Sequence, residues 1–209
     1  PIIRRPAEKD WTYLTHCTRR QSGPWPDEEE NTYLDDLILD RSGADHSAFA
    51  SLWRIVRSAR LLATQGLIRG DTPVVSFTAV PLSQIHTLRT FRSHLSRWDF
   101  EPFGICIRRD WLQQRETHPV RYGDESLWER LSDEQRPFFQ KRESTSRTGT
   151  VIDWTVEQEW RHVGDLVLSE IPQDAAILFV PSRVEAEQLA AISRWPVAIV
   201  SAGSQPEGC

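Results

Sequence analysis

The chain carries the stretch Glu157-Gln158-Glu159-Trp160-Arg161 in its last third, where two carboxylates stand two positions apart beside an aromatic ring and a cation. Side chains of an extended segment alternate between two faces, so Glu157, Glu159 and Arg161 are predicted to share one face. Repulsion between the two carboxylates is expected either to raise the pKa of one of them or to favour the binding of a cationic partner. The charge of Arg161 offsets only part of this repulsion. The segment therefore predicts a strand that carries a polar site. The alternative is a solvated edge strand with an ordinary Glu–Arg contact.

Further strands are predicted where β-branched and aromatic residues cluster between turn residues. The clearest is the run PVVSFTAVP at 73–81, which lies between two prolines and places the hydroxyls of Ser76 and Thr78 on one face. The other predicted strands are 11–18, 103–107, 119–122, 175–180 and 196–201.

Helices are predicted between these strands, where apolar residues recur at helical spacing. One begins after Asp45 or Ser47, carries apolar residues from Phe49 to Ala63, and stops at Gly66 or Gly70. A second begins at Ser83, with an apolar stripe of Ile85, Leu88, Phe91 and Leu95 opposite a basic face that includes Arg89 and Arg97. Shorter helices follow Asp110, Asp124 and the capping box of Ser182 and Glu185, and residues 20–47 form a long connection with a short helix.

The interleaving of short strands and helices sets the expected fold class. Some connections are too short for the crossovers that parallel strands need, so we expect an α+β fold with a mixed, mostly antiparallel sheet flanked by helices. The 209 residues suffice for one hydrophobic core. We expect residues 1–201 to form one domain and residues 202–209, which are small and polar, to form a flexible tail.

Composition limits the classes of function. The net charge of −5, from 30 acidic and 25 basic residues, argues against a nucleic-acid-attracting field over the whole protein, so any contact with a polyanion must be local. The three cysteines show no paired spacing, which is typical of neither a disulfide framework nor a zinc knuckle and fits a reducing cytosol. No long apolar run and no secretion signal is present, which predicts a cytoplasmic protein without membrane contact. The glycine-rich phosphate-binding motifs and the nucleophile elbow are also absent.

Three segments, taken in order, resemble the signature of ADP-ribosyltransferases. His16 and Arg19 lie at the end of the first strand, Ser76-Phe77-Thr78 lies on a second, and Glu157-Gln158-Glu159 lies on a later one. The family has an Arg or a His at the first position, so His16 and Arg19 are both candidates, and Phe77 stands where the family has Thr. The stretch from residue 75 through 119–122 to 161 is also similar to bacterial abortive-infection proteins of the AbiGi kind. This likeness covers about residues 11 to 200.

The transferase resemblance implies a split sheet with NAD, the substrate, in the cleft and with Glu159 as the catalytic carboxylate. Cleavage of the bond from ribose to nicotinamide builds positive charge on the sugar, and a carboxylate beneath the ring stabilises that charge most in the transition state. Glu157 would then orient or deprotonate the acceptor.

The remaining candidate residues would hold NAD. Arg19 offers a planar fork for the pyrophosphate, and His16 could instead bind a ribose hydroxyl. Ser76 and Thr78 would support the strand under the nicotinamide. An aromatic face for stacking would come from Phe77 or Tyr13. No metal ligands are assigned.

The expected function is an NAD-dependent ADP-ribosyltransferase of a bacterial defence or toxin-antitoxin system, with a protein or nucleic-acid acceptor. A metal-dependent nuclease using Asp153, Glu157 and Glu159 is one alternative. A non-enzymatic, antitoxin-type protein that binds a partner from a phage-defence operon is another. The basic face with Arg89 and Arg97, and the nearby aromatic Trp98, suit either nucleic-acid contact or ordinary solvation and packing.

Overall fold

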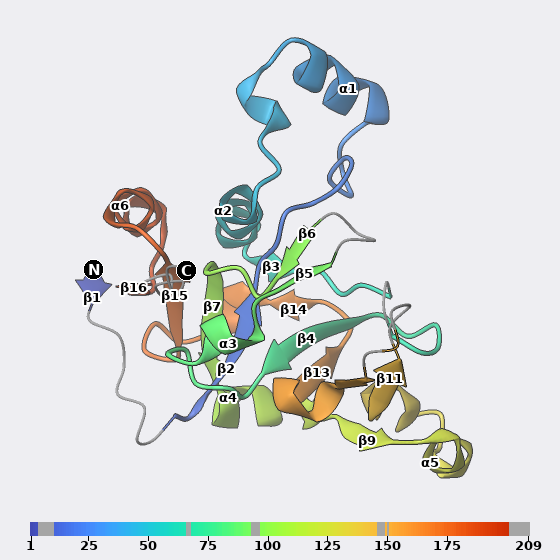
Figure 1. Ribbon diagram of the computed structural model, residues 1–209. Coiled ribbons are helices and arrows are strands. Elements are labelled where there is room, and N and C mark those ends of the chain that lie inside the picture. The colour runs from blue at the N-terminus through green and yellow to red at the C-terminus, as the bar shows by residue number, and fades with distance from the viewer. Residues whose placement is uncertain (4–10, 66–67, 93–96, 146–148, 150, 201–209) are drawn as a thin grey trace, which may run out of the picture.

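A mixed sheet of eight strands runs through the protein. Its computed structural model is drawn in Figure 1. The structure describes residues 1–3, 11–65, 68–92, 97–145, 149 and 151–200. In spatial order the strands are β1 (Ile2–Ile3), β16 (Val197–Ile199), β15 (Ala176–Val180), β7 (Gly104–Arg108), β2 (Tyr13–Cys17), β4 (Val74–Thr78), β13 (Glu159–Val163) and β8 (His118–Pro119). Only the pairings of β16 with β1 and with β15 are parallel in this sheet. The predicted α+β class with a mixed, mostly antiparallel sheet is confirmed.

Helices cover both faces of the sheet. On one face, α2 (Ala48–Ser58) and α6 (Arg183–Ile192) bury Leu52 and Leu189 in the main core, together with Ile105 of β7. On the other face, α3 (Ile85–Leu88) packs on a smaller core that includes Cys106 of the same strand. Because neighbouring residues of a strand point to opposite faces, β7 supplies both cores. The capping box of Ser182 predicted for the start of α6 is confirmed.

The end of α2 differs from the prediction. The Ser47 side chain caps the helix by accepting from the backbone N–H of Ala50, as expected. However, the helix stops at Ser58, because Ala59 adopts a left-handed conformation with φ 51°. The chain then enters β3 (Arg60–Leu61), which pairs with β14 (Leu166–Val167). Extension of the helix to Ala63 was therefore wrong.

The long helix predicted from Ser83 is also wrong. After the single turn of α3, the chain forms an antiparallel hairpin of β5 (Thr90–Arg92) and β6 (Arg97–Asp99). The helical spacing of the apolar residues describes only neighbours along the chain. It does not reveal that Phe91 contacts Trp98 across the hairpin, and this contact favours the strands. Leu95 and the predicted tail at 202–209 lie outside the described residues.

The helix α1 (Glu30–Ile38) stands away from the sheet at the top of Figure 1. It buries none of its residues, and Leu34, Leu37 and Ile38 are exposed. No helix in the described parts of the chain is both long and apolar enough to cross a membrane.

The remaining elements are short. They are η2 (Ser42–Ala44), α4 (Arg109–Gln113), β9 (Arg121–Gly123), α5 (Glu125–Arg130), η4 (Arg136–Phe138), β10 (Phe139–Lys141), β11 (Glu143–Thr145), β12 (Val151–Asp153), η5 (Trp154–Glu157) and η6 (Leu168–Glu170). Parallel β9 and β10, and antiparallel β11 and β12, form two small sheets. The hairpin of β11 and β12 is followed by η5, which leads directly into β13.

Candidate functional site

A cavity of about 1110 Å³ opens where the sheet parts between β2 and β4. The register of these strands contains one residue pair, Thr15 with Thr78. Seven of the eight predicted site residues border the cavity, namely His16, Arg19, Ser76, Phe77, Thr78, Glu157 and Glu159. The eighth, Tyr13, does not. Three segments that are far apart in the sequence therefore meet at one hollow.

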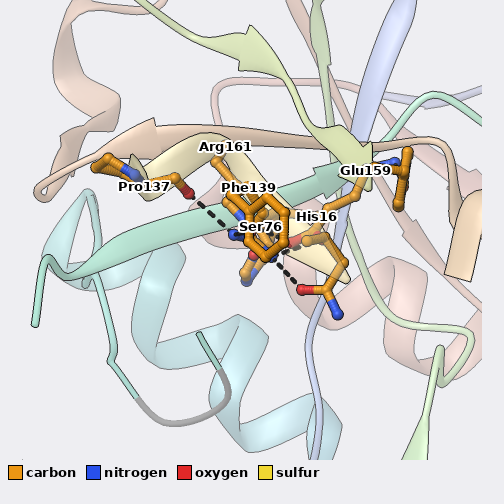
Figure 2. Close-up of polar contacts among 8 residues, drawn as sticks. His16, Ser76, Pro137, Phe139, Glu159 and Arg161 are labelled. Atoms are coloured by element: carbon orange, nitrogen blue, oxygen red, sulfur yellow. Dashed lines mark hydrogen bonds and ion pairs between the residues drawn. The ribbon is translucent and has the colours of Figure 1, made fainter. Parts of the chain in front are cut away.

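Ser76 and Glu159 are brought together by the pairing of β4 with β13. The antiparallel register sets Thr78 opposite Glu159 and Ser76 opposite Arg161, so the four side chains share a face. The Ser76 hydroxyl donates to Oε1 of Glu159 at 2.8 Å. Figure 2 shows this contact beside His16 and Arg161. The hydroxyl-bearing strand thus positions the carboxylate directly.

Arg161 is the buried anchor of the site, with a side chain 2% exposed. Its Nε and Nη2 donate to the two oxygens of Glu159 at 2.8 and 2.9 Å. Its remaining N–H groups donate to the carbonyl oxygens of Pro137 and Phe139, and to Oε1 of Gln140, at 2.8 to 2.9 Å. A guanidinium has five N–H donors, so every one has an acceptor. This satisfaction explains how a charged side chain is tolerated in the interior.

Glu157 reaches the cavity by a route that the sequence did not predict. It ends η5, and Gln158 adopts a left-handed conformation with φ 44°, so β13 begins at Glu159 rather than at Glu157. The predicted extended segment 157–161 was therefore wrong in its first two residues. The Thr78 hydroxyl donates to the Glu157 carbonyl oxygen at 2.6 Å and fixes this turn. Both acids still border the same cavity.

The carboxyl of Glu157 titrates near neutral pH. Burial raises its pKa to about 7, and the charge of Glu159 adds to this rise. Arg92, whose Nη2 lies 3.8 Å from the Glu157 carboxylate, opposes the rise. An acid with a pKa near the working pH is suited to take up and release a proton.

The raised pKa of Glu157 predicts a stability that falls with rising pH. Between pH 4.5 and about 7 the unfolded carboxyl has lost its proton while the folded one retains it, so the free energy of unfolding decreases as pH rises through this window. The difference amounts to about 3 kcal/mol. We expect Glu157→Gln to be more stable than the wild type by up to about 3 kcal/mol at pH 8 and nearly equal at pH 4.5.

Chemical denaturation at the two pH values measures this difference. The matched control is Glu29→Gln, because Glu29 is exposed and forms no ion pair within the described residues. A gain for Glu157→Gln that is equal at both pH values would contradict the assigned titration.

His16 bridges the gap between the parting strands. Its Nδ1 lies 2.9 Å from the Ser76 carbonyl oxygen, and because a carbonyl only accepts, Nδ1 is the donor. Burial lowers the pKa of His16 to about 4, against the effect of this hydrogen bond, and the charge of Arg19 lowers it further. The ring is therefore neutral at pH 7, which leaves Nε2 as an acceptor. His16 can bind a hydroxyl but supplies no positive charge.

Arg19 is the cation best placed for an anionic ligand. Four other arginines border the cavity, and each is paired with a carboxylate: Arg54 with Asp27, Arg60 with Asp165, Arg92 with Asp99, and Arg161 with Glu159. Arg19 forms no ion pair within the part of the chain that the structure describes. His16 is therefore suited to a hydroxyl group of a ligand, and Arg19 to an anionic group.

Neither predicted stacking residue offers an open aromatic face. Phe77 borders the cavity, but its side chain is 2% exposed and packs in the main core, 5.8 Å from the His16 ring. Tyr13 packs against Trp11 in the smaller core. The alternation of side chains explains both outcomes, because the strand faces that hold these rings are covered. Thr78 is likewise buried and serves the turn at Glu157.

Several residues of the site were not among the site residues predicted from the sequence. Tyr122 accepts a hydrogen bond from the backbone N–H of Glu159 at 2.8 Å, and burial raises the pKa of this phenol to about 12. Gln140 contacts Arg161, and Arg92 lies 5.0 Å from the ring of Trp154. These residues come from different elements, so only tertiary contacts identify them.

The carboxylates do not gather as metal ligands. Among the residues that the structure describes, no group of three or more His, Cys, Asp or Glu side chains could hold a metal ion. Asp153 caps η5 by accepting from the backbone N–H and the hydroxyl of Thr155. The trio of Asp153, Glu157 and Glu159 thus finds no support in the geometry.

No protein-family model, no curated protein and no solved structure matches this chain.

Proposed function

We propose that this chain is an ADP-ribosyltransferase-like enzyme that cleaves NAD at Glu159 and acts in a bacterial defence or toxin system. The observation that carries the proposal is the meeting of His16 and Arg19, of Ser76, and of the two acids at one cavity of about 1110 Å³. Ligand pockets commonly measure roughly 300 to 1,000 Å³, so the cavity has room for a dinucleotide.

The parting of the sheet supports an ADP-ribosyltransferase-like arrangement of strands. Only Thr15 and Thr78 pair between β2 and β4, and the hydrogen bond from His16 to the Ser76 carbonyl replaces further backbone pairing. A ligand can therefore lie between two strands that carry different parts of the site.

The environment of Glu159 suits the stabilisation of positive charge on a ribose. An ionised carboxylate accepts about four hydrogen bonds, and Ser76 and Arg161 supply three. One position remains for a ribose hydroxyl. The fixed orientation means that little reorganisation is needed when charge develops on the sugar.

The neighbouring residues supply the other tasks. Glu157, with its pKa of about 7, takes the proton of the acceptor. Arg19 holds the pyrophosphate through its planar fork, and Nε2 of neutral His16 accepts from a ribose hydroxyl.

Binding of NAD is tested by thermal stabilisation. We expect NAD to raise the midpoint of unfolding of the wild type, because a ligand at 100 times its Kd adds about 2.7 kcal/mol. In Arg19→Gln we expect at least tenfold weaker binding, since a charge-assisted phosphate contact is lost, with a loss of about 1.5 to 3 kcal/mol.

The control for Arg19→Gln is Arg20→Gln, which removes the same charge from the neighbouring residue, which does not border the cavity. Equal loss of the NAD effect in both variants would point to general charge rather than to this site. Absence of any NAD effect on the wild type would contradict the proposed substrate.

A second candidate, a non-enzymatic binding protein, is favoured by α1. Residues 27–40 hold seven acids and no Lys or Arg, and the exposed Leu34, Leu37 and Ile38 lie on one face of the helix. Such a helix suits an apolar groove with a basic rim on a partner protein. Wild-type protein that neither binds nor cleaves NAD would favour this candidate.

A further inference from the structure

The β5–β6 hairpin stands at the edge of the cavity and has two unlike faces. Its register sets Phe91 opposite Trp98 and Arg92 opposite Arg97. Residues directly opposite in such a ribbon share a face, so the aromatic pair occupies one face and the arginine pair the other. Phe91, Arg92 and Asp99 border the cavity. The hairpin therefore connects the candidate active site with the outer surface.

The arginine face anchors the hairpin to the site. Nε of Arg92 donates to Asp99 at 2.8 Å, and Nε of Arg97 lies 3.6 Å from the same carboxylate. The guanidinium of Arg92 also lies 5.0 Å from the ring of Trp154, and it lies close to Glu157. These contacts hold the hairpin in place without using its aromatic face.

The aromatic face is open. Phe91 is 48% exposed and Trp98 is 39% exposed, with their ring centroids 5.2 Å apart. The guanidinium carbon of Arg89 lies 4.6 Å from the centroid of the Trp98 ring. Exposed aromatic faces can stack on the planar bases of a single strand. A planar ligand could stack here beside a cation.

The local charge points to an anionic ligand. Residues 72–98 contain no Asp or Glu, in a chain whose net charge is −5. Of the arginines in this stretch, Arg92 and Arg97 face Asp99, whereas Arg89 forms no ion pair within the described residues. Arg19 borders the same cavity as Phe91 of the hairpin, which adds a second cation without a carboxylate partner within the described residues. Arginines that follow a backbone of phosphates, with aromatic rings that stack on bases, are typical of single-strand binding.

We propose that the β5–β6 hairpin binds single-stranded nucleic acid, with bases stacked on Phe91 and Trp98 and with Arg89 at the phosphates. The bases of a duplex are already stacked and offer no free face, which is why a single strand is specified. DNA and RNA share this chemistry.

The role of this strand as the acceptor rests on the proposed function. In the transfer, the bond from ribose to nicotinamide breaks and nicotinamide leaves with its electron pair. A base nitrogen or oxygen of the strand bonds to the ribose carbon, and Glu157 takes the proton that this atom carried. Phe91 borders the same cavity as Glu157, so a strand that stacks on the hairpin can extend a neighbouring base into this cavity.

The test measures fluorescence anisotropy of labelled 12-nucleotide strands of DNA and of RNA, with the full chain and without NAD. We expect Trp98→Ala and Phe91→Ala each to weaken binding roughly 5- to 140-fold, as the loss of one stacked base does. Trp98→Phe keeps an aromatic ring and should retain most of the affinity. Arg89→Ala should reduce the salt dependence of log K by about 0.7, whereas Arg183→Ala, an exposed arginine on α6, should leave it unchanged.

Three results would overturn the proposal. They are no binding of either strand, equal binding by wild type and Trp98→Ala, and equal binding of a duplex of the same sequence. Displacement of the strand by a polyglutamate peptide, with no effect of Trp98→Ala, would instead assign the surface to an acidic protein. If strand binding follows the variants as expected while NAD has no effect, the hairpin site stands and the transferase proposal fails.

Discussion

Replacement of Arg161 by leucine is expected to destabilise the protein by about 3 to 5 kcal/mol, as removal of one partner of a buried ion pair does. The variant leaves the Glu159 carboxylate without its cation. It also leaves the carbonyl oxygens of Pro137 and Phe139 without a donor. Figure 2 shows these carbonyls around the guanidinium. Denaturant unfolding at neutral pH measures the loss.

The control for this variant is Arg183→Leu. Arg183 forms an ion pair with Glu187 at 2.8 Å, but its side chain is 80% exposed. Exposed pairs contribute about 0 to 1 kcal/mol, so this variant should remain near the wild type. The double variant Arg161→Leu with Glu159→Leu removes both charges and should recover part of the stability. Equal, small losses for Arg161→Leu and Arg183→Leu would show that Arg161 does not anchor the site.

Glu159→Gln is expected to slow the cleavage of NAD by about 10²- to 10³-fold, the effect of losing one preorganised electrostatic contact. Glutamine keeps an oxygen that can accept from Ser76, but it carries no charge to stabilise a positive ribose. Its NH2 group also faces an N–H of Arg161, so the rate is measured at a temperature at which the variant is shown to be folded. Chromatographic measurement of released nicotinamide gives the rate.

Two comparisons separate this effect from a loss of folding or binding. Glu159→Gln should retain the thermal stabilisation by NAD, because the change is in the transition state rather than in substrate binding. Glu157→Gln should reduce transfer to an acceptor more than it reduces cleavage by water, since its proposed role concerns the acceptor. Wild-type rates in Glu159→Gln would remove this residue from the mechanism, even if NAD binds.

The elements that the sequence predicted well depend on local interactions. The run at 73–81 forms β4 because β-branched residues between prolines favour an extended segment. The starts of α2 and α6 follow from Ser47 and Ser182, whose side chains accept from backbone N–H groups within the first turn. The helix predicted from Ser83 failed because spacing alone does not reveal a partner across a hairpin.

The sequence predicted most of the residues that border the cavity, but it did not predict the contacts that these residues make. Glu157 and Glu159 do share the cavity, but the left-handed Gln158 rather than strand alternation brings Glu157 there. Phe77 or Tyr13 was expected to stack on a ligand, and both are packed in the cores. Aromatic residues on strands bury whichever face the neighbouring layer covers, and one sequence does not state which face that is.

By itself, the amino-acid sequence determined the α+β class, the main strands and the capped starts of α2, α5 and α6, because strand propensity and helix caps arise from neighbours within a few residues. Only the tertiary structure decided that β2, β4 and β13 lie side by side and that β2 and β4 part to open a cavity. It also decided that Arg161 finds acceptors on a segment more than twenty residues away. These outcomes depend on the order of strands in the sheet and on complete hydrogen bonding of a buried charge, which are properties of the whole fold.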